Sequence, residues 1–69
     1  MQITDAIRSI QETIEEETAR GYNTKLLYKA LRHYKKALKY ATNYNVLKCT
    51  KSIERAEDYL NRYKHGECY

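Results

Sequence analysis

The sequence contains no proline, phenylalanine or tryptophan, and it has only two glycines, Gly21 and Gly66. Proline is the residue that most strongly interrupts a helix, so its absence permits long helices throughout the chain. Both glycines stand where the periodic apolar pattern breaks, and a glycine readily closes a helix in a left-handed conformation. The pattern therefore predicts helices that end near these two glycines.

Cysteines and long apolar runs are also scarce. The chain has two cysteines, Cys49 and Cys68, which do not indicate a disulfide framework without extracellular context. No stretch approaches the roughly 18 apolar residues of a transmembrane helix, and residues 1–14 lack the basic and then apolar order of a signal peptide. We expect a cytoplasmic protein with reduced thiols that does not insert into a membrane.

The residue combinations typical of enzymes are missing as well. There is no glycine-rich phosphate-binding loop and no HExxH motif. His33 and His65 are the two histidines, and neither is spaced to recruit a serine, cysteine or aspartate from its own helix. His65, Glu67 and Cys68 lie close in sequence but lack the paired spacing of a structural zinc site. We expect a non-catalytic protein that holds no metal and no cofactor.

Apolar residues recur at steps of three and four along three stretches, which is the spacing of one helix face. They are Ile3, Ile7, Ile10 and Ile14 in the first stretch, Leu27, Leu31, Tyr34, Leu38 and Ala41 in the second, and Val46, Cys49, Ile53, Ala56, Leu60 and Tyr63 in the third. Helices joined by short connections pack as antiparallel neighbours. The sequence predicts one all-α domain over residues 1–69, a three-helix antiparallel bundle with helices near 4–20, 24–42 and 46–65.

Core positions follow from the same pattern. Leu31 and Leu38 lie on the apolar stripe of the second predicted helix. We expect both to be buried, so that replacing either by alanine costs about 2–5 kcal/mol of stability.

The second predicted helix is strongly basic. Six lysine and arginine residues and no acidic residue lie between Lys25 and Thr42. At about 100° per residue, most of these cations fall opposite the apolar stripe. Like charges four residues apart, such as Arg32 and Lys36, repel by a few tenths of a kcal/mol per pair. An acidic partner would relieve that repulsion. The alternative interpretation is a solvated surface that keeps a small protein in solution, and the sequence leaves both open.

Two motifs resemble a known family. An Ala-x-x-x-Tyr-x-x-Ala-Leu motif covers residues 30–38 of the second predicted helix, and Arg-Ala-Glu follows at residues 55–57. Together with the acidic segment that leads into Gly21, they resemble the microtubule-interacting and transport (MIT) domain. That family is a three-helix bundle of about this size, so the resemblance spans nearly the whole chain. Its members bind leucine-bearing tails of membrane-scission filament subunits in grooves beside the third helix. The resemblance implies that such a groove, facing the second helix, is lined in part by Ala56, Tyr59 and Tyr63.

The leading hypothesis is a small protein–protein interaction module that recognises an acidic or helical segment of its partner. One alternative is a small nucleic-acid-binding or regulatory protein that uses the basic side of the second helix. A further alternative is a structural homo-oligomer, although we expect a monomer or a weak homodimer. The predicted partner-binding residues are Lys25, Lys29, Arg32, Lys36, Lys39, Tyr40, Ala56, Tyr59 and Tyr63.

Overall fold

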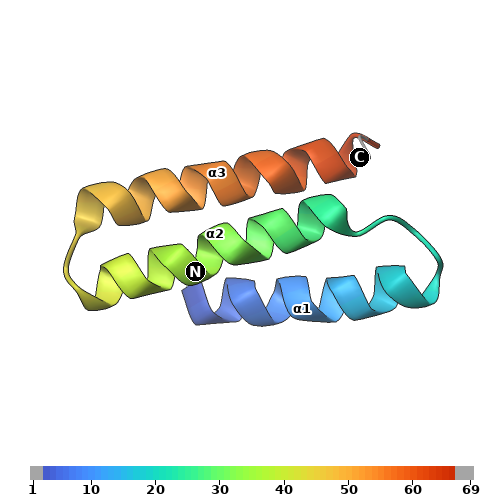
Figure 1. Cartoon of the computed structure of the whole chain (residues 1–69), viewed down its shortest axis with the longest axis horizontal. Helices are drawn as coiled ribbons and strands as arrows, with labels where there is room; N and C mark the ends of the chain where they lie inside the picture. Colours follow the sequence, from blue (N-terminus) through green and yellow to red (C-terminus); the bar gives the residue numbers. More distant parts are fainter. Residues whose placement is uncertain (1–2, 67–69) are drawn as a thin grey trace.

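The computed structural model describes residues 3–66 of the chain and contains three α-helices and no strand within that range. Helix α1 spans Ile3–Ala19, α2 spans Lys25–Thr42 and α3 spans Val46–Lys64. Successive helices run in opposite directions (Figure 1). The predicted all-α, three-helix antiparallel bundle is confirmed, and the helix ends differ from the expected ones by at most one residue. Glu67 and Cys68, considered above as metal ligands, lie outside the described residues.

Hydrogen bonds at Gly21 close the C-terminal end of α1. Gly21 has a φ of 83°, and its N–H donates to the Thr18 carbonyl oxygen at 3.0 Å. The Tyr22 N–H donates to the Glu17 carbonyl oxygen at 3.0 Å, which completes a Schellman motif. The left-handed helix end expected at this glycine is therefore confirmed. The chain then enters α2, where the Asn23 side chain accepts a hydrogen bond from the Lys25 N–H at 3.0 Å.

The turn between α2 and α3 uses the same hydrogen-bond pattern without a glycine. Tyr44 takes the left-handed position with a φ of 57°. Its N–H donates to the Ala41 carbonyl oxygen at 3.1 Å, and the Asn45 N–H donates to the Tyr40 carbonyl oxygen at 2.8 Å. A side chain in this conformation costs free energy because its Cβ crowds the following carbonyl oxygen. The Tyr44 side chain is 90% exposed, so no packing compensates that cost.

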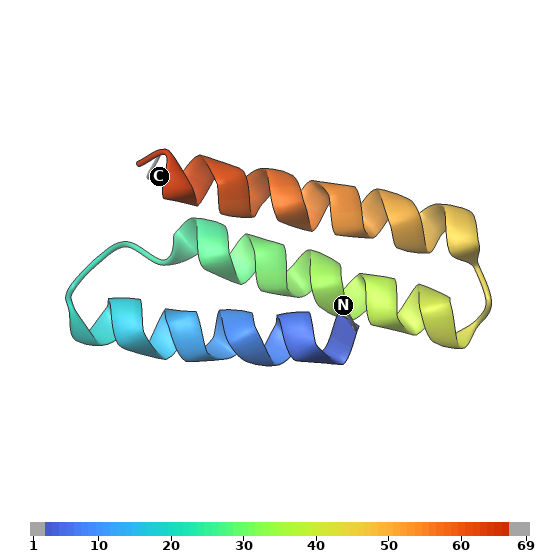
Figure 2. The ribbon, with the colours of Figure 1, turned by 180° about the vertical axis from the view of Figure 1, so that it is seen from behind.

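Helix α2 lies between the other two helices in both views of the molecule (Figures 1 and 2). Each neighbour packs against α2, and α3 packs against it more closely than α1 does. Among the described residues, no Cα atom of α1 lies within 8 Å of a Cα atom of α3. The bundle is therefore open on the side where α1 and α3 would otherwise meet.

The seam between α2 and α3 includes small, buried side chains beside larger residues of α3, such as Ile53, that pack against the core cluster. Ala30 and Ala37 of α2 and Ala56 of α3 are completely buried, and Ser52 of α3 is 8% exposed. Small residues at a contact allow two helix axes to approach closely. This seam therefore accounts for the tight packing of α3 on α2.

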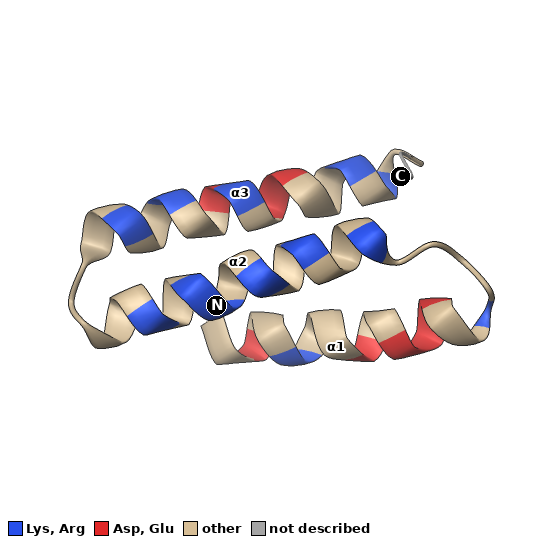
Figure 3. Cartoon of the chain, viewed as in Figure 1, with Lys and Arg blue, Asp and Glu red and all other residues tan. Residues whose placement is uncertain are grey.

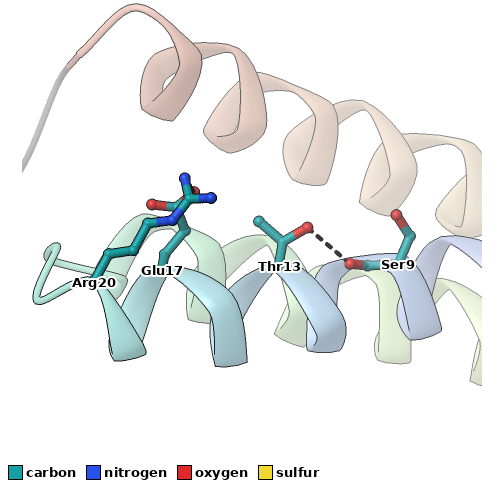
Figure 4. A network of polar contacts seen from close by, with 4 residues as sticks. All are labelled: Ser9, Thr13, Glu17 and Arg20. Carbon is teal, nitrogen blue, oxygen red and sulfur yellow. Dashed lines mark hydrogen bonds and ion pairs between the residues drawn. The ribbon is translucent and has the colours of Figure 1, made fainter.

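The packing of α1 on α2 depends on large side chains. Ile10 and Ile14 of α1 are buried in one core cluster with Leu27 and Leu31 of α2. A polar row of α1, including Thr13, is turned toward α3 (Figure 4). In that row the Thr13 hydroxyl donates to the Ser9 carbonyl oxygen at 2.9 Å, and Arg20 lies 4.0 Å from the Glu17 carboxylate. Helix α1 has a single apolar face, and that face packs on α2. For this reason the backbone of α1 does not approach that of α3.

Three positions of the predicted apolar stripes are exposed, which corrects the sequence-based expectation. Leu31 is buried as expected, but Leu38 is 36% exposed and Val46 is 72% exposed. Ala41 is exposed as well. Figure 1 shows the reason, because α2 continues past the start of α1 and its last turns have no α1 neighbour. These residues satisfy the helical period, but no third helix covers them.

Within the part of the chain that the structure describes, no helix combines the length and the apolar character needed to cross a lipid bilayer.

Candidate functional site

Lysine and arginine residues form a row along α2 and a second row along α3, and we call the two rows together the basic face. Within each helix these residues recur at steps of three, four or seven, so they share one side of that helix. Figure 3 shows basic residues at intervals along both helices, with acidic residues among them on α3 and none on α2. The basic face consists of Lys25, Lys29, Arg32, Lys36 and Lys39 of α2 and of Lys48, Lys51, Arg55 and Arg62 of α3.

Contacts around Tyr59 of α3 join the two rows of cations. The His33 ring of α2 stacks on the Tyr59 ring, with centroids 5.5 Å apart and planes 14° apart. The Lys29 Nζ atom lies 5.7 Å from the Tyr59 ring centroid, and the Arg62 Cζ atom lies 5.9 Å from it. Cations over an aromatic ring are attracted by its negative face. One tyrosine thus holds cations from two helices beside each other.

A hollow of about 300 Å³ opens further along the α2–α3 seam, and we call it the basic hollow. The Lys48 Nζ atom lies 5.7 Å from the Tyr40 ring centroid at its edge. No acidic side chain of the described residues lines it. The lining residues are His33, Lys36, Tyr40, Lys48, Lys51, Ser52 and Arg55.

The positive charge around the hollow is strong enough to affect His33. Partial burial lowers the pKa of His33 below its ordinary value of 6.5, and the nearby charges of Lys36, Arg55 and Arg32 lower that pKa further. Each of these causes disfavours the protonated ring. His33 is therefore predominantly neutral at pH 7, and the cations of the hollow are its lysines and arginine.

The basic face extends along the outer side of α2. A shallow depression of about 470 Å³ is lined there by Arg32, Lys36 and Lys39, together with Tyr28, Leu31 and Lys35. Lys36 also lines the basic hollow. The two concavities therefore share a wall and form one positively charged surface.

The structure brings together most of the predicted site residues, but not all of them. Tyr40 and Tyr59 lie with the predicted lysines and Arg32 of α2 on the basic face. Ala56 is completely buried in the α2–α3 seam. Tyr63 lines a different groove, on the opposite side of the seam. The groove implied by the MIT resemblance, with Ala56, Tyr59 and Tyr63 on one wall, is thus divided between two surfaces and the core.

Sequence reasoning missed the cations of α3 that complete the basic face. Their spacing was readable from the sequence, since Lys48, Lys51 and Arg55 follow steps of three and four. Acidic residues of the same helix, including Glu54 and Glu57, bring its net charge close to zero and conceal the pattern. Sorting the charges of this helix by face, rather than summing them, would have revealed the row.

A third concavity is an apolar groove of about 390 Å³ between α1 and α3. Leu27 and Tyr34 of α2 line it where the two outer helices fail to meet. Burial raises the pKa of Tyr34, and the negative charge of Glu57 raises it further. The groove is also lined by Ala6, Ser9, Ile10, Thr13, Glu17, Leu60, Tyr63 and Lys64.

Comparison of the chain with protein-family models, with curated proteins and with solved structures finds no match. The structure shows a three-helix bundle of the kind that the MIT resemblance implies, whereas no family model supports MIT membership itself.

Proposed function

We propose that this protein is a small, non-catalytic interaction module that binds an acidic, partly helical segment of a partner protein on the basic face. The observation that carries this proposal is the convergence of cations from two helices on one surface. Helix α2 contributes no acidic residue to this surface. The completely buried alanines of the seam hold the cationic row of α3 close to that of α2.

The balance of charges supports an acidic partner. Among the described residues, Lys36, Lys48, Lys51 and Arg55 form no ion pair with a carboxylate. Cations held close together without counter-charges repel one another, and this repulsion lowers the stability of the folded state. An acidic segment would relieve it and would also be steered to the surface by the positive potential.

The aromatic residues of the basic face favour a protein partner over single-stranded nucleic acid. Single strands bind by stacking their bases on free aromatic faces. Tyr59 is already engaged by the rings and cations around it, and Lys48 lies over the Tyr40 ring.

The MIT-like motifs favour the same class of partner. Two alanines of the residue 30–38 motif, and Ala56 of the Arg-Ala-Glu motif, form the α2–α3 seam. Members of the MIT family bind tails of other proteins beside this pair of helices. We propose on these grounds that the resemblance to that family lies in the α2–α3 hairpin.

Charge reversal tests the proposal. Arg32→Glu combined with Lys39→Glu reverses two exposed cations of the basic face. Arg8→Glu combined with Arg20→Glu is the matched control, because it changes the net charge equally within α1 and at its C-terminal end. Each protein is used to capture partners from a nuclease-treated extract of the source cell. The captured segment is then synthesised as a peptide and titrated calorimetrically against all three proteins.

We expect the wild-type protein and the α1 control to bind an acidic peptide and the basic-face variant to lose that binding. Equal binding by the basic-face variant, or capture of a segment that is not acidic, contradicts the proposal. Binding that requires nucleic acid would instead disappear after nuclease treatment. For duplex DNA, a plot of the logarithm of the binding constant against the logarithm of the salt concentration would have a slope of about −0.9 per phosphate contact. A stable oligomer on size-exclusion chromatography that only the basic-face variant disrupts would indicate self-assembly.

A further inference from the structure

The basic hollow points to the chemistry of the ligand. We propose that it binds the phosphoryl group of a phosphorylated serine or threonine in the partner segment. This inference rests on the proposed function, because the same segment would continue from the hollow along the basic face.

The number of cations in the hollow suits a dianion. Lys36 of α2 and Lys48, Lys51 and Arg55 of α3 line it, and no carboxylate of the described residues offsets them. A glutamate or aspartate side chain brings one negative charge. A phosphorylated side chain carries about −1.5 to −2 charges at pH 7 and three strong acceptor oxygens. Four cations around one hollow are therefore better matched by a phosphoryl group than by a single carboxylate.

The kinds of donor in the hollow also suit a phosphoryl group. A guanidinium such as that of Arg55 presents paired N–H donors that match two phosphate oxygens, and lysine ammonium groups add point charges. Tyr40 and Ser52 add hydroxyl donors to the lining. Such a set offers charge and hydrogen bonds to every oxygen of the group.

Ser52 provides independent support. It is the buried polar residue of the described chain, at 8% exposure, and it lines the hollow. Its hydroxyl makes no hydrogen bond to the residues that the structure describes, and none of their buried polar side-chain atoms lacks a partner, so the Ser52 hydroxyl oxygen itself reaches solvent. A solvent-facing hydroxyl can exchange its water for a charged acceptor, which is a stronger hydrogen-bond partner. Ser52 therefore has a donor available where the other side chains supply charge.

The arrangement of the cations favours a phosphomonoester over a nucleic-acid backbone. Lys48, Lys51 and Arg55 span about 10 Å along α3, at roughly 1.5 Å per residue, and they share one hollow with Lys36 of the facing helix. Each phosphodiester carries one charge, so a strand would need several phosphates in contact to neutralise the cluster, whereas a phosphomonoester brings up to two charges at a single point. The dianionic group at the end of a phosphorylated side chain can enter the hollow without a second strand or a flanking base.

Three synthetic peptides test the inference. They share one acidic, helix-forming sequence and differ at a central position, which is serine, glutamate or phosphoserine. Binding to the wild-type protein is measured by fluorescence anisotropy. We expect the phosphoserine peptide to bind about tenfold or more tightly than the glutamate peptide, since hydrogen bonds to charged groups are among the strongest in proteins.

Two variants distinguish recognition of the phosphoryl group from general attraction. Lys48→Gln with Lys51→Gln should bring the affinities of the phosphoserine and glutamate peptides close to each other. Lys25→Gln with Lys39→Gln removes the same charge outside the hollow and should weaken both peptides while keeping their ratio. Ser52→Ala, a smaller change, should reduce the ratio without altering the circular dichroism spectrum.

Inorganic phosphate alone provides a second readout. Titrated into ¹⁵N-labelled protein, it should shift the amide signals of Ser52 and Arg55 saturably and leave those of α1 unchanged. If the phosphoserine and glutamate peptides bind equally, the inference is overturned while the proposed function stands. If neither phosphate nor any of the peptides binds the wild-type protein, both are overturned. A short DNA duplex that displaces phosphate at lower concentration than the phosphoserine peptide would assign the hollow to nucleic acid.

Discussion

The α2–α3 seam contains completely buried alanines and a serine beside partly buried large residues of α3, whereas α1 contributes mainly isoleucines to the core cluster. The small side chains bring α3 close to α2. The row of cations on α2 and the row on α3 therefore lie beside each other and form one positively charged surface. The large side chains of α1 pack on α2 at a wider spacing, and its polar row leaves the apolar groove open toward α3. The size of the residues at a helix contact thus decides what the surfaces beside that contact can bind.

This contrast has an energetic side. Burial of large apolar side chains against α1 is the kind of contact that stabilises a small domain, at roughly 25 cal/mol per Å² of apolar surface. The α2–α3 seam, in contrast, places like charges together. We infer that α1 contributes mainly to stability and that the α2–α3 hairpin carries the binding surface.

The largest expected effect comes from breaking the α1–α2 interface. Leu31→Ala removes a buried side chain of the core cluster and should cost about 2–5 kcal/mol. Leu38→Ala, on the part of α2 that α1 does not cover, should cost about 1 kcal/mol or less. Urea denaturation of both variants measures the difference. Equal losses would mean that α1 covers the whole length of α2.

A second substitution widens the α2–α3 seam. Ala56→Leu inserts a large side chain where none fits and should cost about 1–3 kcal/mol. Ala6→Leu is the matched control, because Ala6 lines the apolar groove and the added atoms can extend into it. Thermal unfolding followed by circular dichroism compares the two. A seam variant that is as stable as the control would contradict the close approach of α3 to α2.

A substitution in the turn between α2 and α3 should have a smaller effect, and it should stabilise the protein rather than destabilise it. Tyr44→Gly relieves the left-handed backbone at φ 57° and should stabilise the protein by about 1 kcal/mol or less. Tyr22→Gly is the control, since Tyr22 is exposed but has no positive φ. That variant should leave stability unchanged or lower it. A loss of stability in Tyr44→Gly would show that the Tyr44 side chain makes a stabilising contact.

The smallest expected effect is the contribution of His33 to the pH dependence of the protein's stability. Its pKa is lowered in the folded state relative to 6.5, so the unfolded chain binds the proton more readily. Stability should therefore fall as the pH drops through 6.5 and below, and His33 should have no influence above that range. His33→Gln should remove this part of the loss, which denaturation midpoints measured from pH 7.5 to pH 5 would reveal. An unchanged pH profile would mean that neither burial nor the charges of Lys36 and Arg55 lower the pKa of His33 in the folded protein.

Sequence alone determined the features that depend on neighbouring residues. Helical periodicity gave the three helices and their ends, because the period of an amphipathic helix is a local property. Gly21 could be assigned to a left-handed helix end for the same reason. The basic row of α2 was also readable, since five of its cations recur at steps of three and four opposite the apolar stripe.

Tertiary structure decided which helix faces are covered and which rows of cations lie side by side. Leu38 fits the apolar stripe of α2 but stays exposed, because the position of α1 along α2 is set by packing between distant segments. Ala56 and Tyr59 lie close together in sequence, yet one is buried in the seam and the other holds cations at the surface. Lys48, Lys51 and Arg55 form a cationic hollow only because Lys36 of α2 lies beside them in the folded protein. The physical reason is that a period fixes the direction of a side chain around its own helix axis, whereas the spacing and offset between helices depend on side chains far apart in the sequence.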